Sequence, residues 1–353
     1  MDAWVWWFLF LIIIVFIMVK TKKSETTDNG EKRQFIRNTY NNERKEIFKL
    51  LRYSDSKYSK VVAFDLETTG LSADRDEIIE IGAIKINLET GEQSKFNRLI
   101  KPKRKLSKEI ISITGISNEM LLEGVNIKNA LSDFLIFIGD LPLVAHNAKF
   151  DAEFLTSSLG KNLGVLSFEN LFIDSIAQLK QHMKRLDSYK LKDVVESLGI
   201  DANPNHRAIN DADAVAKIYK LTYEKYLEAK REAEKTKEMY DFVMGNQDIV
   251  KCMYYVLRID GKLLAKERPV ALDYLIKEFG EKSFFDDDFI KRYFCNNDAV
   301  PSPNNFLKSL KAIENKNSFL EFAEQILTIK KKPSELEIST LELIKKTIQS
   351  PVS

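Results

Sequence analysis

Short apolar runs alternate with amphipathic stretches between Lys60 and residue 222 of this 353-residue chain. A short apolar run bounded by turn signals is typical of a buried strand, whereas apolar residues at three- and four-residue spacing indicate a helix. We predict strands at 61–66, 77–87, 95–102, 141–148 and, passing into a helix, 171–180. We predict helices within 107–140 and at 150–160 and 191–200, and we predict that 205–221 begins in a loop and becomes a helix. This alternation predicts an α/β domain at 60–222.

The pattern changes after residue 222. Residues 223–240 are rich in charge and in strong helix formers, which predicts a solvated connecting helix. Residues 241–353 show no strand alternation, and their apolar residues recur at helical spacing. The sequence therefore predicts a small all-α domain after the connecting helix.

The N-terminus carries an apolar segment of a different kind. Residues 3–19 are uninterrupted apolar, close to the ~17-residue lower limit for a helix that spans a bilayer. Tryptophans cluster at one end and Lys20, Lys22 and Lys23 follow at the other, which favours a cytoplasmic location for the rest of the chain. We predict a transmembrane anchor at 1–20, single-pass in the cell membrane. The alternatives are a cleaved secretory signal, for which a basic start and a small-residue cleavage site are missing, and a buried core helix.

The charged residues add little to this division of the chain. Residues 21–59 are polar and charged, and we predict a solvated linker between the anchor and the α/β domain. The chain has 54 basic and 52 acidic residues, so its net charge of +2 gives no general attraction for nucleic acid. The two cysteines, Cys252 and Cys295, lack the spacing of a zinc site or a disulfide framework.

Two carboxylates stand at the end of the first predicted strand. Asp65 and Glu67 are two positions apart, so on a strand their side chains point to the same face. Two carboxylates in that arrangement repel each other unless a cation lies between them, and Mg²⁺ prefers such oxygen ligands. The alternative is that Asp65 or Thr68 caps a following turn.

Asp151 follows the strand predicted at 141–148. The carboxyl ends of strands in open sheets are where ligands gather, which makes Asp151 a candidate ligand. Capping of the next helix is the alternative.

His206 and Asp211 form the third candidate group. They are five residues apart, so their side chains diverge if both lie on one helix. They converge if His206 lies in a loop, which Pro204 and Asn205 favour, and Asp211 lies in the helix that follows. A surface or helix-capping histidine remains the alternative for His206.

Three segments together resemble a known family. FDLETTG (64–70), HNAKFD (146–151) and HRAINDAD (206–213) are similar, in order and spacing, to the three motifs of the DEDDh (DnaQ-like) exonuclease superfamily, which includes the proofreading subunit of bacterial DNA polymerase III. The resemblance implies an RNase H-like fold, a mixed central sheet flanked by helices. It also implies two Mg²⁺ or Mn²⁺ ions bound by Asp65, Glu67, Asp151 and Asp211, with His206 as general base.

The resemblance also implies a substrate and the residues that bind it. The substrate would be a single-stranded 3′ end of DNA or RNA, which the enzyme would hydrolyse to 5′-mononucleotides. The implied substrate-binding residues are Leu66, Thr68, Thr69, Gly70, Glu80, His146 and Asn147. Leu66 would act as an apolar wedge beside the backbone donors of the turn. Two alternatives stay open: Glu80 is a strand residue that faces solvent, and His146 shapes the second motif through a hydrogen bond.

The C-terminal part weakly resembles TerB-like helical domains. There Asp260 and Glu267 would bind a cation, and the structural alternative is an interhelical turn followed by a first-turn helix residue. We expect a protein partner for this domain. The leading hypothesis for the chain is a membrane-anchored 3′→5′ exonuclease. The alternatives are a non-catalytic nucleic-acid or protein scaffold and a polymerase-associated proofreading subunit.

Overall fold

A computed structural model describes residues 52–165, 167–295, 300–329 and 332–349 of the chain. The predicted anchor at 1–20 and the linker up to residue 51 lie outside the described residues. Within the described ranges, no helix combines the length and the apolar character needed to cross a bilayer. Contacts divide the chain into two units, with the division between Lys225 and Tyr226.

The first unit is built on a five-stranded mixed sheet. Its strands are β1 (Lys60–Thr68), β2 (Ile78–Asn87), β3 (Gln93–Leu99), β4 (Leu143–Ala145) and β5 (Phe172–Asp174). Their order across the sheet is β3-β2-β1-β4-β5. β1, β2 and β3 pair antiparallel, whereas β4 lies parallel to both β1 and β5. All five predicted strands are present, and the mixed sheet is confirmed.

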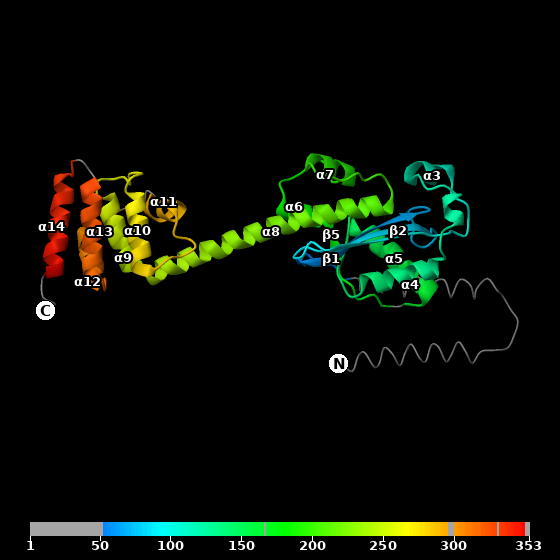
Figure 1. Ribbon diagram of the computed structural model, residues 1–353, viewed down its shortest axis with the longest axis horizontal. Helices are drawn as coiled ribbons and strands as arrows, with labels where there is room; N and C mark the ends of the chain where they lie inside the picture. The colour runs from blue at the N-terminus through cyan, green and yellow to red at the C-terminus, as the bar shows by residue number, and fades with distance from the viewer. Residues whose placement is uncertain (1–51, 166, 296–299, 330–331, 350–353) are drawn as a thin grey trace, which may run out of the picture. The chain divides into compact units, whose positions relative to one another are not determined.

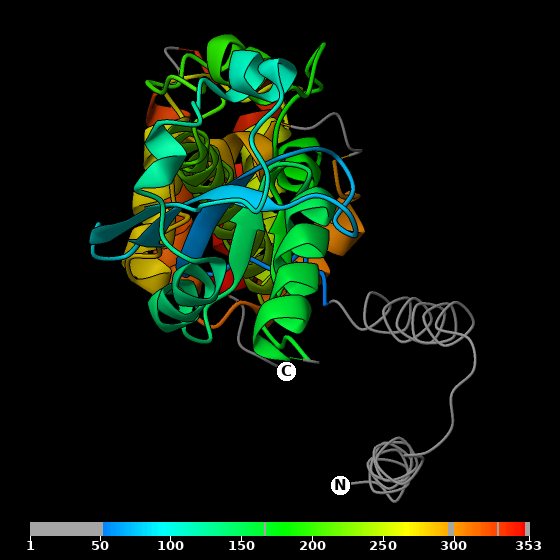
Figure 2. The ribbon, with the colours of Figure 1, turned by 90° about the vertical axis from the view of Figure 1, so that its right-hand side faces the viewer.

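Helices cover both faces of this sheet. They are α3 (Lys108–Thr114), η1 (Met120–Leu122), α4 (Ile127–Ile138), α5 (Ala148–Leu163), α6 (Ser175–His182), α7 (Leu191–Ser197) and α8 (Ala208–Gly245). Apolar residues of α4 and α5 pack on one face, and those of α8 pack on the other. Figures 1 and 2 show this layered arrangement in two views a quarter turn apart.

The alternation along β1 decides which way its carboxylates point. Val62 and Phe64 pack toward α4 and α5, whereas Val61 and Ala63 pack toward α8. Asp65 and Glu67 continue the odd-numbered series, because side chains alternate along a strand. The apolar core therefore fixes both carboxylates on the α8 side of the sheet.

The final helix of the first unit is longer than predicted. The helix predicted at 205–221 and the connecting helix predicted at 223–240 are one uninterrupted helix, α8, which continues into the second unit. No glycine or proline interrupts residues 208–244, so no residue in this stretch breaks the helix.

The end of the predicted linker also differs from the prediction. Residues 52–59 are part of the first unit rather than a solvated tether. The backbone N–H of Phe172 in β5 donates to the carbonyl of Arg52 (2.8 Å). The Tyr219 hydroxyl of α8 accepts from the N–H of Tyr58 (2.9 Å) and donates to its carbonyl (3.0 Å). The edge of β5 thus offers backbone N–H and C=O groups to the preceding segment, and the polar composition of that segment does not predict this pairing.

The regular elements among the described residues of the second unit are all helices, as predicted. After the end of α8 it contains α9 (Gln247–Arg258), α10 (Arg268–Phe279), α11 (Asp287–Phe294), α12 (Pro303–Ala312), α13 (Lys316–Ile329) and α14 (Glu335–Gln349). Asp260 and Gly261 lie in the turn between α9 and α10, and Gly261 has a left-handed φ of 89°. Glu267 is buried at the N-cap of α10 and accepts from the N–H of Leu264 (2.7 Å). This geometry matches the structural alternative for Asp260 and Glu267.

Candidate active site

Four carboxylates from three elements meet near the end of β1. Asp65 and Glu67 come from β1, Asp151 from the first turn of α5, and Asp211 from the first turn of α8. Asp65 is partly buried, whereas the other three residues are at most 9% exposed. The negative charges lie close enough to raise one another's pKa. The structure therefore brings together the four predicted ligands.

Asp151 links the second motif to the first. Its Oδ1 accepts a hydrogen bond from the backbone N–H of Leu66 in β1 (3.2 Å), 85 positions earlier in the chain. Asn147 occupies the N-cap position of α5 with a left-handed φ of 60° and makes no side-chain capping bond. The alternative that Asp151 caps this helix is therefore wrong. Its carboxylate is directed at the strand that carries Asp65 and Glu67.

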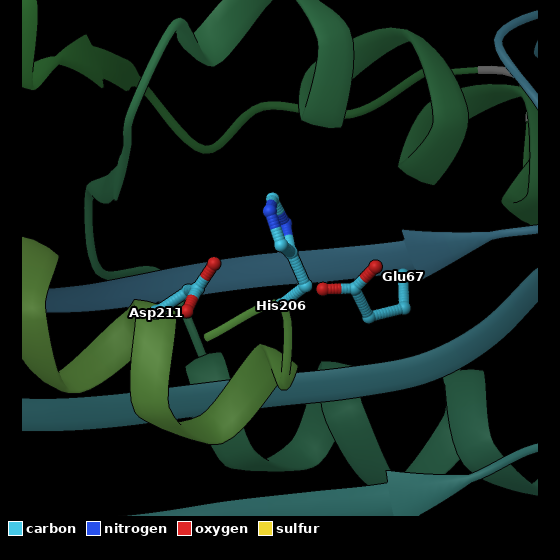
Figure 3. Close-up of side chains that lie close together, drawn as sticks. All are labelled: Glu67, His206 and Asp211. Atoms are coloured by element: carbon cyan, nitrogen blue, oxygen red, sulfur yellow. The ribbon is translucent and has the colours of Figure 1, made fainter. Parts of the chain in front are cut away.

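The third motif has the predicted conformation. His206 lies in the loop before α8 with a left-handed φ of 57°, and Asp211 lies in the first turn of the helix. The Oδ1 of Asp211 accepts from the backbone N–H of Asn205 (3.0 Å), which fixes the loop against the helix. Potential ligand atoms of Glu67, His206 and Asp211 lie within 4.8 Å of one another. Figure 3 shows the imidazole between the two carboxylates.

The site holds more negative charge than its surroundings stabilise. Burial, followed by the charges of neighbouring carboxylates, raises the pKa of Asp65 well above its ordinary value of 3.8. Burial and then Asp211 raise the pKa of Glu67 to about 8. Burial also raises the pKa of Asp151 to about 8, although its bond from Leu66 opposes the shift. The pKa of Asp211 is raised mainly by burial.

These shifts and the donor set fit divalent cations. Buried carboxylates at this spacing are unfavourable as a group of anions, and a bound cation removes both the desolvation and the repulsion. Arg207 lowers the pKa of Glu67, but its guanidinium is paired with Glu80. Carboxylate oxygens are the ligands that Mg²⁺ and Mn²⁺ prefer. Asp65, Glu67, Asp151 and Asp211 are thus suited to hold such ions.

Glu80 has neither of the surroundings expected from the sequence. Its side chain is fully buried in β2, so the alternative of a solvent-facing strand residue is wrong. Its Oε2 accepts from Nε of Arg207 (3.1 Å) and from the backbone N–H of Ala208 (3.0 Å). Its Oε1 accepts from the second guanidinium nitrogen of Arg207 (2.8 Å). Both carboxylate oxygens bond to the third motif, so the geometry gives no support to the predicted contact of Glu80 with a nucleotide.

The predicted apolar wedge, Leu66, is also placed elsewhere. Leu66 is 4% exposed and packs in the core between the sheet, α4 and α5, so the wedge role is wrong for this residue. Leu71, five positions later, is 89% exposed. It is an exposed apolar side chain in this turn. The sequence reasoning missed it, although the apolar residue directly after TTG was the available signal.

The turn after Glu67 is held by its own polar groups. The Thr68 hydroxyl donates to the carbonyl of Gly70 (2.6 Å). The Thr69 hydroxyl accepts from the N–H of Glu77 (2.9 Å), and the Thr69 N–H donates to the Glu77 carbonyl (2.9 Å). Contacts of Thr68, Thr69 and Gly70 with substrate remain a prediction.

His146 joins the second motif to two neighbouring elements. Its Nε2 lies 2.7 Å from the carbonyl of Tyr189, and its Nδ1 lies 2.8 Å from the hydroxyl of Ser175. Since a carbonyl only accepts, Nε2 carries the proton and Nδ1 accepts from Ser175. Burial lowers the pKa of His146, consistent with a neutral ring. The geometry agrees with the alternative that His146 shapes the motif. Asn147 is exposed beside it, and its contact with substrate stays a prediction.

Known proteins are similar to part of this chain. Residues 62–219 match a family model described as "RNase_T: Exonuclease". The chain is 44% identical over 160 residues to the PolC-type DNA polymerase III of Thermotoga maritima, which covers 45% of this chain and 11% of that protein. It is 39% identical over 156 residues to the PolC-type DNA polymerase III of Bacillus subtilis, covering 44% and 11%. This chain thus spans about a tenth of the length of these relatives.

A solved structure is similar to about half of this chain. The nuclease domain of 3′hExo, described as a DEDDh family member bound to rAMP, has 21% sequence identity and a TM-score of 0.41, and the match covers 50% of this chain and 95% of that one.

The fold, the carboxylate set and the family match define the class of the first unit. A mixed sheet with four converging carboxylates is the arrangement of a metal-dependent nuclease. Residues 62–219 are thus similar to exonuclease domains, in agreement with the resemblance of the three sequence motifs. A domain of this type implies bound divalent metal ions.

Proposed function

We propose that this chain is a metal-dependent 3′→5′ exonuclease that releases 5′-mononucleotides from single-stranded 3′ ends of DNA or RNA. The observation that carries the proposal is the convergence of Asp65, Glu67, Asp151 and Asp211 around one place, with His206 beside them. Two Mg²⁺ or Mn²⁺ ions are the cofactors this oxygen-rich set favours. When bound, the ions would activate the attacking water and neutralise charge that develops on the phosphate.

His206 is placed to move the proton of the reaction. A general base must reach its proton donor, and the imidazole is exposed on a loop beside Glu67 and Asp211. An imidazole nitrogen can accept a proton and release it again, which suits this side chain to the role. The attacking water would give its proton to this ring before the bond to the 3′ oxygen of the penultimate nucleotide breaks.

The turn after Glu67 is the proposed binding site of the terminal nucleotide. Leu71 is almost fully exposed there, and an aliphatic side chain can pack against the face of any of the bases. Thr68, Thr69 and Gly70 form the floor of this turn, and Asn147 lies exposed beside the second motif. Such contacts do not choose between DNA and RNA.

Nucleotide release from a 3′-labelled single strand, with Mg²⁺ or Mn²⁺, tests the proposal directly. Asp65→Asn and Asp211→Asn should each abolish release, because each removes a charged ligand. Asp213→Asn is the matched control, since Asp213 lies on the same helix as Asp211 but pairs with Lys217 (2.8 Å). No metal-dependent release from either DNA or RNA by the unaltered chain would instead favour a non-catalytic scaffold.

A role beside a polymerase is the second candidate. The similarity to PolC-type DNA polymerase III favours it, because a domain of that kind can act on errors left by a polymerase. The helical second unit is then the candidate surface for a protein partner. A stable complex with a polymerase, recovered with the full chain and lost without residues 226–353, would support this candidate.

The proposal includes a membrane anchor at residues 3–19, with the catalytic domain in the cytoplasm. Its support is the sequence alone, namely the apolar run, its tryptophans and the lysines that follow. Fractionation of cells that express the full chain or residues 52–353 tests it. The full chain should sediment with membranes and resist salt extraction, whereas the shorter chain should not. Equal recovery of both in the soluble fraction would refute the anchor.

A further inference from the structure

The buried carboxylate of Glu80 accepts its hydrogen bonds from one short segment, at the start of α8. It is fully buried in β2, yet all three hydrogen bonds that its oxygens accept come from Arg207 and Ala208, about 127 positions later. A buried carboxylate is strongly unfavourable without such partners. The two bonds from Arg207 are parallel and bidentate, a geometry that the planar guanidinium provides and a lysine ammonium does not.

Gly82 of β2, which has no side chain, also lets the backbone of α8 lie close to the strand. A Cβ placed on Gly82 would lie 2.1 Å from the carbonyl carbon of Ala208 and 2.2 Å from the nitrogen of Ile209. The start of α8 therefore lies directly on the strand at Gly82, where any side chain would displace it. Glu80 and Gly82 together form a seat for the start of the helix.

This seat is in register with the carboxylates of β1. In the antiparallel pairing, Glu80 lies opposite Glu67 and Gly82 lies opposite Asp65. Hydrogen bonds of a sheet hold these pairs at a fixed separation. Whatever is fixed to the seat is thereby fixed relative to Asp65 and Glu67.

The residues fixed to the seat belong to the catalytic loop. His206 directly precedes Arg207, and its left-handed φ of 57° is a conformation that non-glycine residues adopt rarely. Asp211 lies one helical turn after Arg207, and its backbone N–H donates to the Arg207 carbonyl (3.0 Å). A shift of Arg207 would consequently move the proposed base and one proposed metal ligand together.

We propose that Glu80 and Arg207 are positioning residues, whose ion pair sets the place of His206 and Asp211 relative to Asp65 and Glu67. This inference rests on the proposed nuclease function and goes beyond it, since neither residue needs to touch nucleic acid. The rival explanation is that Arg207, whose side chain is 30% exposed, binds a substrate phosphate directly. The two explanations predict different kinetic effects.

Substitution of Arg207 separates them. Arg207→Lys keeps the positive charge but loses the bidentate geometry, and Arg207→Gln loses both. Positioning predicts that both variants lower kcat at least ~10-fold while KM for a single-stranded oligonucleotide changes less than ~2-fold, because misplaced supporting groups typically lower activity ~10- to 100-fold. Direct phosphate binding predicts that Arg207→Lys stays near wild type and that Arg207→Gln raises KM and weakens its salt dependence. The second pattern would overturn the inference.

Binding of Mn²⁺ provides a measurement that is independent of activity. Calorimetric titration with Mn²⁺ alone should show ~10-fold weaker binding for Glu80→Gln and for Arg207→Gln, since Asp211 is displaced in both. The double variant should lose no more than either single variant, because both remove one interaction. Arg98→Gln is the control, as Arg98 forms an exposed ion pair with Asp133 (3.6 Å). Additive losses, or Mn²⁺ binding and kcat both within ~2-fold of wild type, would refute the inference.

The outcomes also separate this inference from the proposed function. An inactive wild-type chain whose Mn²⁺ binding falls in the Glu80 and Arg207 variants would refute the nuclease proposal but support the positioning of Asp211. If Glu80→Gln does not fold, Arg207→Lys keeps the test open, because it leaves the bond from Ala208 to Glu80 in place. Circular dichroism at the assay temperature decides which variants are folded.

Discussion

Replacement of Glu67 by glutamine tests whether burial and charge repulsion in the metal-free site destabilise the folded domain. Burial, followed by the charges of Asp211, Glu80 and Asp151, raises the pKa of Glu67 from its ordinary 4.5 to about 8. Between these two values the folded protein keeps a proton on the carboxyl that the unfolded chain has lost. Since the folded state binds more protons, the free energy of unfolding falls as the pH rises through this window.

The size of the effect follows from the width of the window. Each pH unit corresponds to ~1.4 kcal/mol, so between pH 5 and pH 8 the wild-type domain loses at most about 4 kcal/mol through Glu67. The neighbouring carboxylates titrate together and share the change, so we expect about 2 kcal/mol for the single substitution. Because glutamine has no charge at any pH, Glu67→Gln escapes this loss. For a domain of this size, the gain corresponds to a Tm higher by ~4–8 °C at pH 8.

Thermal unfolding with a chelator present, at pH 5 and pH 8, measures this difference. Glu67→Gln should unfold well above wild type at pH 8 and within about 2–3 °C of it at pH 5, because the linkage then contributes only ~1 kcal/mol. Mg²⁺ should stabilise wild type more than the variant, since only wild type regains a charged ligand. Glu89→Gln, on the exposed hairpin between β2 and β3, is the control. A variant no more stable than wild type at pH 8, or a gap that does not depend on pH, would refute the reasoning.

Three further predictions follow from the same geometry. His206→Ala should lower kcat ~10²- to 10⁴-fold while calorimetric Mn²⁺ binding changes little; unchanged turnover would remove the general-base role. Mn²⁺ affinity should rise between pH 6 and pH 8 with release of protons, because Asp151, whose pKa is about 8, must lose its proton to bind the ion. Calorimetry in buffers of different ionisation enthalpy detects the released protons, and their absence would contradict the raised pKa of Asp151. Gly82→Ala should destabilise the domain by at least ~2 kcal/mol in urea unfolding, because its Cβ would meet the Ala208 backbone; a neutral effect would show that α8 can move away.

The sequence predicted those parts of the site that depend on local geometry. The two-residue period of a strand put Asp65 and Glu67 on one face before any fold was known. The helical period required a loop at His206 for convergence with Asp211, and the loop is present. All five strands and the helical nature of the second unit followed from apolar spacing. Local periodicity is sufficient for these features because each depends on residues a few positions apart.

The prediction was wrong where a residue's surroundings come from distant parts of the chain. Glu80 stands in a strand that is buried along most of its length, and its carboxylate is paired with Arg207, 127 positions later in the chain, which local sequence does not identify. Leu66 lies near the end of β1 and Leu71 lies in the turn that follows, and only the packing of α4 and α5 against the sheet buries the first and leaves the second exposed. Residues 52–59 have a polar, linker-like composition, yet 52–54 pair with the edge of β5 and Tyr58 bonds to Tyr219 of α8.

The sequence alone determined the kinds of elements, the three motifs and the identity of the carboxylates that converge. The tertiary structure decided the frame that holds them: β2 pairs with β1 on one side and seats the start of α8 through Glu80 and Gly82. The physical reason is the range of the forces involved. Backbone periodicity acts within one element, whereas close packing and the pairing of a buried charge depend on segments more than a hundred residues apart that meet only in the folded domain.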